Sequence, residues 1–195
     1  SDTCHQSVLV TDNQLPVILC PPTITISCAT ELPAAYSTYD EFVNAGGSAS
    51  DNDGINPATF SLESQSSNNQ SCPETISRVY KIADNSNNYS SCTQLIIIDD
   101  EIEPSLVVPT AVIVSCSGVP DVGTATASDN CDINPVVTYL GETRADGDCA
   151  GEYTLTRTWT ATDACGNTSQ ASQTINVQDI SAPVIASLPA PTTID

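Results

Sequence analysis

An imperfect tandem repeat constrains the fold of this chain more than any other feature of its 195 residues. Four residues recur at a single offset of 88: Cys4, Asp12, Pro16 and Cys28 correspond to Cys92, Asp100, Pro104 and Cys116. Four more recur at an offset of 79: Arg78, Asp84, Asp100 and Pro104 correspond to Arg157, Asp163, Asp179 and Pro183. One structural unit is therefore repeated along the chain, and its second copy is nine residues shorter than its first.

The repeat register predicts four segments: the last strand of a preceding repeat (residues 1–15), two complete repeats (16–103 and 104–182), and the first strand of a following repeat (183–195). The connections between repeats are short, contain no flexible Gly/Ser run, and each end in a proline, which restricts φ. We therefore expect the repeats to follow one another end to end as a stiff rod, in which the partners of each repeat are its neighbours in the same chain.

Short segments of alternating polarity between turn signals predict strands rather than helices in each repeat. In residues 153–162 every second residue is threonine, and the intervening positions include Leu155, Trp159 and Ala161, which is the pattern of a half-buried strand. The strands predicted in the second repeat are 112–116, 123–128, 136–140, 153–162 and 168–177. Because no segment has a helical period, we predict an all-β, immunoglobulin-like sandwich for each repeat, with a closed barrel as the lesser alternative.

The strongly acidic composition excludes several classes of function. The chain has 24 Asp and Glu but only 4 Lys and Arg, so it lacks the basic surface that nucleic acid binding requires. No apolar stretch is long enough for membrane insertion. His5 is the only histidine, and neither a nucleophile motif nor a phosphate-binding loop occurs, so we expect no enzymatic activity. The acidity itself indicates either a solvated surface or Ca²⁺ binding through oxygen ligands.

Nine cysteines without a Cys-x-x-Cys pair predict disulfides formed in an oxidising, extracellular compartment. The two repeats provide an internal control on the pairing, because true partners should be gained and lost together. Cys28 and Cys72 have counterparts in Cys116 and Cys149, whereas Cys20 and Cys92 align with Val108 and Ala171, and Cys131 and Cys165 align with Asp53 and Ser86. The predicted bridges are therefore Cys20 with Cys92, Cys28 with Cys72, Cys116 with Cys149, and Cys131 with Cys165.

Cys4 is left over by this pairing. It occupies the Cys92 position of the preceding repeat, whose Cys20 equivalent would lie before residue 1. The alternative is a reactive or intermolecular thiol.

Two stretches resemble the hyalin (HYR) repeat family. Residues 15–24 (LPVILCPPTI) resemble the opening of such a repeat, and residues 158–168 (TWTATDACGNT), continuing to 175–179 (INVQD), resemble its closing hairpin and last strand. The tandem arrangement, extra cysteines and acidity are similar to the repeats of large Bacteroidota surface adhesins of the SprB-like gliding-motility type. The resemblance implies an immunoglobulin-like fold and a role in cell adhesion at the cell surface.

Two acidic clusters are candidate Ca²⁺ sites. The first lies at the junction of the repeats, beside Pro104, where mutual repulsion would disfavour a compact junction unless a cation intervened; it consists of Asp99, Asp100, Glu101 and Glu103. Calcium there would lock the angle between the repeats. The alternative is an exposed edge whose charges prevent aggregation between strands.

The second cluster lies at two turns of each repeat. If Cys131 and Cys165 are bonded, the side chains of four residues approach one another: Asp129, Asp132, Asp163 and Asn167. In the first repeat the same places hold Asp51, Asp53 and Asp84. The alternative is ordinary turn chemistry, because Asp and Asn side chains bond their own backbone in turns.

Two functional hypotheses follow. The repeats are either structural spacers in the stalk of a secreted adhesin, or modules that themselves bind a glycan or another surface. A binding module should repeat its surface in each copy, but the threonine ladder of residues 153–162 is not kept in the first repeat, which favours the spacer. Arg78 and Arg157 occupy matching positions among apolar neighbours, so we predict that both are structural.

Overall fold

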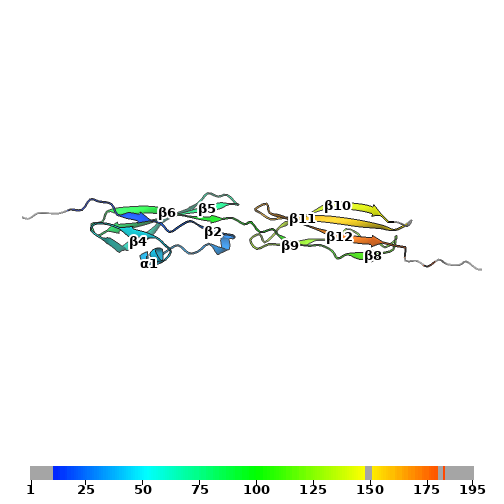
Figure 1. Ribbon diagram of the computed structural model, residues 1–195. Coiled ribbons are helices and arrows are strands. Elements are labelled where there is room, and N and C mark those ends of the chain that lie inside the picture. Colours follow the sequence, from blue (N-terminus) through cyan, green and yellow to red (C-terminus); the bar gives the residue numbers. More distant parts are fainter. Residues whose placement is uncertain (1–10, 148–150, 180–181, 183–195) are drawn as a thin grey trace, which may run out of the picture. The chain divides into compact units, whose positions relative to one another are not determined.

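The computed structural model describes residues 11–147, 151–179 and 182, and the chain divides into two compact units, residues 1–102 and 103–195 (Figure 1). Each unit contains a pair of sheets arranged like a sandwich, which confirms the predicted all-β class. The predicted boundary between residues 103 and 104 lies beside the division between the units. Most of the predicted flanking segments, residues 1–15 and 183–195, lies outside the described residues.

The first unit consists of a two-stranded sheet, β1-β3, and a four-stranded sheet, β2-β6-β5-β4. All pairs are antiparallel except β2 with β6, which run parallel from Ile24 beside Ile96 to Ile26 beside Ile98. The strands are β1 (Val17–Leu19), β2 (Ile24–Ile26), β3 (Ser48–Ser50), β4 (Ile55–Ser67), β5 (Glu74–Asp84) and β6 (Tyr89–Ile98).

The second unit has the same strand order, with sheets β7-β9 and β10-β11-β12-β8. Its one parallel pair, β8 with β12, occupies the place of β2 and β6. The strands are β7 (Ser105–Val107), β8 (Val112–Val114), β9 (Thr126–Ser128), β10 (Val136–Asp146), β11 (Tyr153–Thr162) and β12 (Thr168–Val177). The last two strands have the predicted bounds, whereas β10 runs six residues further than the predicted 136–140.

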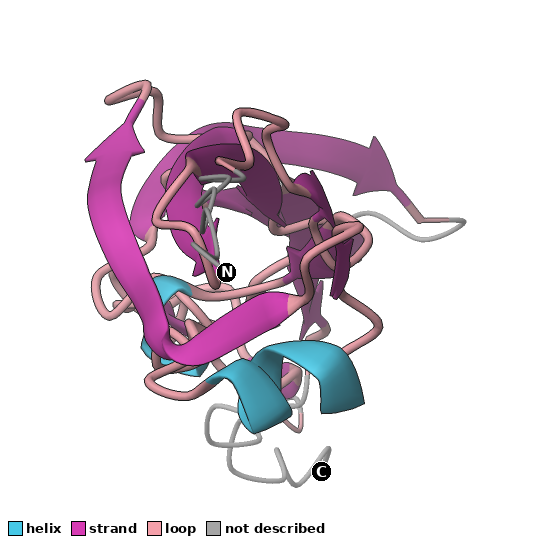
Figure 2. Ribbon diagram, turned by 90° about the vertical axis from the view of Figure 1, so that its left-hand side faces the viewer, coloured by secondary structure: helices cyan, strands magenta, loops and turns pink. Residues whose placement is uncertain are grey.

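The expectation that no helix forms is wrong for the first unit. A short 3-10 helix, η1, spans Ala29–Glu31, and α1 spans Tyr39–Asn44. A capping box starts α1, because Thr38 Oγ1 accepts a hydrogen bond from the Glu41 amide at 3.2 Å while the Glu41 carboxylate accepts from the Thr38 amide at 3.3 Å. Figure 2 shows α1 outside the sheets, where it contacts β4. None of the described helices is long and apolar enough to cross a membrane.

The two cores differ because the described residues of the second unit form no helix equivalent to α1. In the first unit Phe42 of α1 is fully buried and packs against Phe60 and Tyr80, with ring centroids 5.0 and 5.6 Å away. In the second unit the position of Tyr80 is taken by Trp159, which is 2% exposed and packs against Tyr139 at 5.2 Å. Both rings are core residues, but only the first is covered by a helix.

Candidate metal centre and disulfide framework

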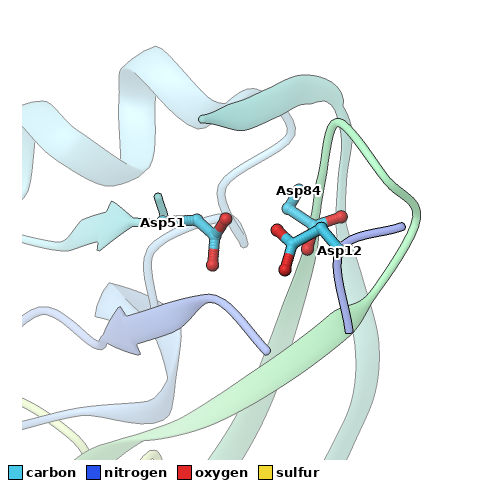
Figure 3. Close-up of side chains that lie close together, drawn as sticks. All are labelled: Asp12, Asp51 and Asp84. Carbon is cyan, nitrogen blue, oxygen red and sulfur yellow. The ribbon is translucent and has the colours of Figure 1, made fainter. Parts of the chain in front are cut away.

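Three aspartates from separate segments of the first unit converge at one end of its sheets (Figure 3). Asp12 precedes β1, Asp51 directly follows β3, and Asp84 is the last residue of β5. Their side chains point toward one another, and one oxygen from each lies within 4.8 Å of the other two. Asp84 is fully buried, and Asp12 and Asp51 are partly buried. The topology therefore places three carboxylates at one point.

Asn88 holds Asp84 in this position. Its backbone amide donates to Asp84 Oδ1 at 2.8 Å, and its side-chain Nδ2 donates to Asp84 Oδ2 at 2.7 Å and to the Asp12 carbonyl at 3.2 Å. Burial acts to raise the pKa of Asp84, but the hydrogen bonds from Asn88 and from the Ser86 and Asn87 amides outweigh it, so the pKa lies below its ordinary value. Asp84 is therefore negatively charged at neutral pH.

Asp12 and Asp51 each leave one buried oxygen unsatisfied. Asp12 Oδ1 accepts from the Gln14 amide at 2.9 Å and Asp51 Oδ1 accepts from the Asp53 amide at 2.8 Å, which is the turn chemistry considered above. The Oδ2 atoms of both residues are buried and have no hydrogen-bond partner. No ion pair of the described residues involves the three aspartates.

Buried carboxylate oxygens without a donor are costly, and three carboxylates this close repel one another. A hard cation with oxygen ligands removes both costs, and Ca²⁺ prefers such ligands. Turn formation and cation binding therefore use different atoms of Asp12 and Asp51. Their Oδ1 atoms accept hydrogen bonds within the turns, and their Oδ2 atoms remain for a cation.

The second repeat carries aspartates at the same three repeat positions: Asp100, Asp129 and Asp163. Asp163 is 7% exposed and repeats the contacts of Asp84, because it accepts from the Asn167 amide at 2.8 Å and from Asn167 Nδ2 at 2.8 Å. Asp129 Oδ1 accepts from the Cys131 and Asp132 amides, both at 2.9 Å.

The remaining candidate ligands have other surroundings. Asp53 Oδ2 accepts from Ser86 Oγ at 2.8 Å, and Asp132 Oδ1 accepts from the Asn134 amide at 2.9 Å. Of the four acidic residues at the junction, only Asp100 corresponds to one of the three converging aspartates, namely Asp12. The positions that correspond to Asp99, Glu101 and Glu103 hold Thr11, Asn13 and Leu15. Asp12 was not among the predicted ligands, although its register with Asp100 was the signal that could have found it.

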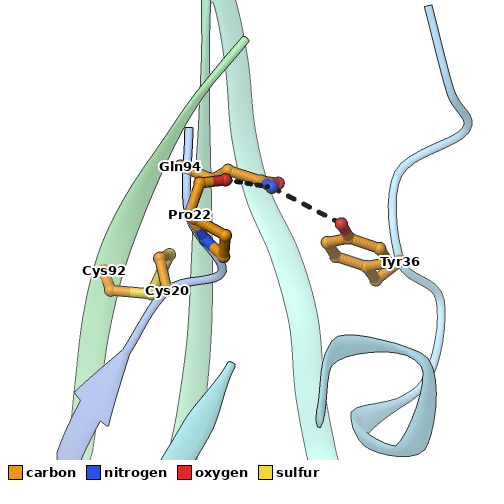
Figure 4. The surroundings of a disulfide bond; sticks show 5 residues. All are labelled: Cys20, Pro22, Tyr36, Cys92 and Gln94. Atoms are coloured by element: carbon orange, nitrogen blue, oxygen red, sulfur yellow. Dashed lines mark hydrogen bonds between the residues drawn. A yellow bond between two sulfur atoms is a disulfide. The ribbon is translucent and has the colours of Figure 1, made fainter. Parts of the chain in front are cut away.

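The predicted bridge between Cys20 and Cys92 is confirmed (Figure 4). It joins the residue after β1 to the middle of β6, across 72 residues of sequence. Beside it, the buried Gln94 donates from Nε2 to the Pro22 carbonyl at 3.3 Å and to the Tyr36 hydroxyl at 3.4 Å. The start of the repeat is thus attached to its last strand by one covalent bond and by hydrogen bonds.

Four further cysteines are disulfide-bonded, and their pairing stays a prediction: Cys28, Cys72, Cys131 and Cys165. Cys116, in contrast, is a free, exposed thiol that donates to the Gly151 carbonyl at 3.3 Å. Its predicted partner Cys149 lies outside the described residues, as does Cys4, so the fourth bridge stays a prediction.

Comparison with known proteins supports part of the resemblance. Residues 104–177 match a family described as an HYR-like domain with 4 cysteines, and this segment contains Cys116, Cys131, Cys149 and Cys165. No curated protein matches the chain. Among solved structures, the CBM51-2 and INT domains of ZmpB from Clostridium perfringens, in complex with GlcNAc, align with 11% identity and a TM-score of 0.30 over 84% of this chain.

The chain spans 42% of the length of that structure. The family match covers residues 104–177, and the residues that the structure describes include three disulfides. Disulfides are typical of secreted and extracellular proteins. Residues 104–177 are therefore similar to an HYR-like domain, in a chain whose disulfides indicate an extracellular protein.

Proposed function

We propose that this chain is part of the stalk of a cell-surface adhesin, in which its repeats are spacers between the cell and a distal adhesive region. The HYR-like domain and the disulfide-bonded, all-β units support an extracellular protein of the adhesion type. The observation that carries the spacer role is the Cys20–Cys92 disulfide. We propose a structural rather than a catalytic role for both units.

The position of this bridge suits a protein under tension. A force applied to the two ends of the first repeat passes from the segment after β1, through the disulfide, to β6. The residues between Cys20 and Cys92 include α1 and most of both sheets, and they are not extended even if the strands separate. A spacer with this bridge keeps its length under load, which a stalk requires.

Pulling on single molecules of the full chain by its termini tests this role. Reduction of the disulfides should add about 250 Å to the length released when the first repeat unfolds, because each extended residue contributes about 3.5 Å and 72 residues separate the bridged cysteines. The second repeat has Val108 and Ala171 at these positions, and the bonded Cys131 and Cys165 lie only 34 residues apart, so reduction should lengthen it by much less. Equal lengths released by the oxidised and reduced chains would contradict the proposal.

We further propose that Asp12, Asp51 and Asp84 of the first unit bind one Ca²⁺. The buried, unsatisfied Oδ2 atoms of Asp12 and Asp51 support this assignment. Asp12 belongs to the segment that leads into β1, whereas the other two ligands belong to the body of the repeat. The ion would hold the leading segment against the sheets and restrict its movement in a stalk.

Calcium should raise the melting temperature of the EDTA-treated chain. Saturation at about 100 times the dissociation constant contributes about 2.7 kcal/mol, which corresponds to a rise of roughly 10–20 °C for a domain of this size. Calorimetric titration should detect Ca²⁺ binding to the chain, and Asp51→Asn should lower the number of bound ions by one.

Asp53→Asn is the matched control for the calcium titration. Asp53 lies two residues away on the same turn and its Oδ2 accepts a hydrogen bond from Ser86, so this variant should bind as many Ca²⁺ ions as the unchanged chain. Equal melting temperatures in EDTA and in excess Ca²⁺, with no heat of binding, would contradict the metal assignment and leave the spacer role untouched, because the disulfide carries that role independently.

A further inference from the structure

The outer face of the four-stranded sheet of the second unit carries no charged residue at the paired positions of β10, β11 and β12. On β11 the side chains of Leu155, Arg157, Trp159 and Ala161 are buried, and the alternating threonines from Thr154 to Thr162 lie on the other face. Their partners on β12 are Thr168, Gln170, Ser172, Thr174 and Asn176. On β10 the partners are two threonines with valine, glycine and alanine.

This absence of charge is not a consequence of the fold. The whole chain has 28 charged residues, and the matching face of the first unit has Lys81 at the position of Thr160, paired with Glu63 at 3.6 Å. That face also exposes Leu95 and Tyr89. The neutral, hydroxyl-rich surface therefore belongs to the second unit specifically.

The hydroxyl groups form a regular array with hydrogen-bonding capacity to spare. Neighbouring strands lie about 4.8 Å apart and outward residues on one strand about 6.8 Å apart, and β11 and β12 pair over ten residues without a register shift. Thr158 Oγ1 lies 3.0 Å from Ser172 Oγ, and Thr160 Oγ1 donates to the Ser169 carbonyl at 3.0 Å. Because a hydroxyl has two acceptor positions and one donor, these groups can still accept hydrogen bonds from a ligand.

We propose that this face binds an uncharged polysaccharide. The net charge of −20 repels polyanions, and a polycation would bind the carboxylates elsewhere rather than a neutral surface. A protein partner requires aromatic or large apolar anchors. The exposed apolar residues of this face, Ile113 and Val136, lie apart on its two edge strands, and none lies among the threonines of β11 or their β12 partners. A neutral glycan both donates and accepts hydrogen bonds, and its ring faces suit the threonine methyl groups. This binding role goes beyond the spacer role.

Retention of the full chain on immobilised polysaccharides tests the proposal. The panel contains cellulose, chitin and mannan as neutral polymers, with polygalacturonate as the polyanion and an immobilised protein mixture as the protein surface. At least one neutral polymer should retain the chain. Thr138→Lys/Gln170→Lys, which flanks Thr160 on both neighbouring strands, should weaken that binding about tenfold, since each lysine must be desolvated in the complex.

Ser61→Lys/Ser91→Lys is the control, because these residues flank Lys81 at the same positions of the first unit, and it should leave binding unchanged. Thr156→Val/Thr174→Val, which removes two paired hydroxyls but keeps β propensity, should weaken binding without any added charge. The proposal would be overturned if none of the neutral polymers retained the chain. It would also be overturned if Ser61→Lys/Ser91→Lys weakened binding as much as Thr138→Lys/Gln170→Lys. Retention by polygalacturonate or by protein alone would overturn the assignment to a neutral glycan.

Discussion

Replacing both Cys20 and Cys92 with alanine is expected to lower the free energy of unfolding of the first unit by about 4 kcal/mol, the chain-entropy effect of a bridge that closes a loop of this length. The bridge spans 72 residues, so its loss gives the unfolded first unit more conformational freedom. The hydrogen bonds from Gln94 would remain, but they attach only Pro22 and Tyr36 to β6. Urea denaturation under oxidising conditions, followed by circular dichroism, measures the effect.

Cys116→Ala serves as the comparison for the double alanine variant. Its thiol is exposed and free in the structure, so its replacement should change stability by less than about 0.5 kcal/mol. A loss as large as that of the double variant would show instead that Cys116 forms its predicted bridge with Cys149. An unchanged midpoint for the double alanine variant would contradict the stabilising role of the Cys20–Cys92 bridge.

The second large effect is expected for Arg157→Leu, which should lower the stability of the second unit by about 3 kcal/mol because it removes one partner of a buried ion pair. Arg157 is 4% exposed and donates to Glu142 Oε2 at 2.7 Å, to the Asp121 carbonyl at 2.9 Å and to the Pro120 carbonyl at 2.8 Å. All three acceptors lose their donor. The expected loss of stability lies at the low end of the range for breaking a buried ion pair, because the Glu142 side chain is 34% exposed and water can reach it.

Arg144→Leu is the matched control, on a neighbouring strand of the same sheet. Arg144 pairs with Asp146 at 2.7 Å, but both side chains are mostly exposed, so the change should cost less than about 1 kcal/mol. The loss of stability caused by Arg78→Leu should lie between those of the Arg157 and Arg144 variants. Arg78 is as buried as Arg157, but it donates to neutral acceptors, Gln65 and the Pro33 carbonyl. Guanidinium denaturation of the three variants gives the order, and an Arg144 variant less stable than the Arg157 variant would contradict it.

The strands that were best predicted are those with an uninterrupted alternation. In β11 and β12 more buried and less buried residues alternate along nearly the whole strand, so their bounds could be read from the pattern. In β10 the register shifts between Tyr139 and Gly141. This bulge changes which face the following residues occupy, and the predicted strand ended where the alternation broke.

The helix α1 could not be predicted from periodicity because six residues are too few to establish a helical period. Its capping box is local, but the burial that stabilises it comes from Phe60 and Tyr80, which lie on β4 and β5. The prediction of the Ca²⁺ ligands failed for the same reason, because residues that lie far apart in the sequence come together in the fold. Carboxylates adjacent in the chain, such as Asp99 and Asp100, were grouped together, although alternate residues of an extended segment point in opposite directions.

The sequence by itself determined the repeat, the all-β class and the Cys20–Cys92 bridge, because two copies of one fold preserve the register of partner residues even where local patterns are weak. Only the tertiary structure decided which carboxylates meet. Asp12 lies about 40 residues from Asp51 and about 70 from Asp84 along the chain, and they converge because β1, β3 and β5 present their ends at the same place. The physical reason is that cation binding depends on the distances between ligand atoms in space, and sheet topology, not separation along the chain, sets these distances.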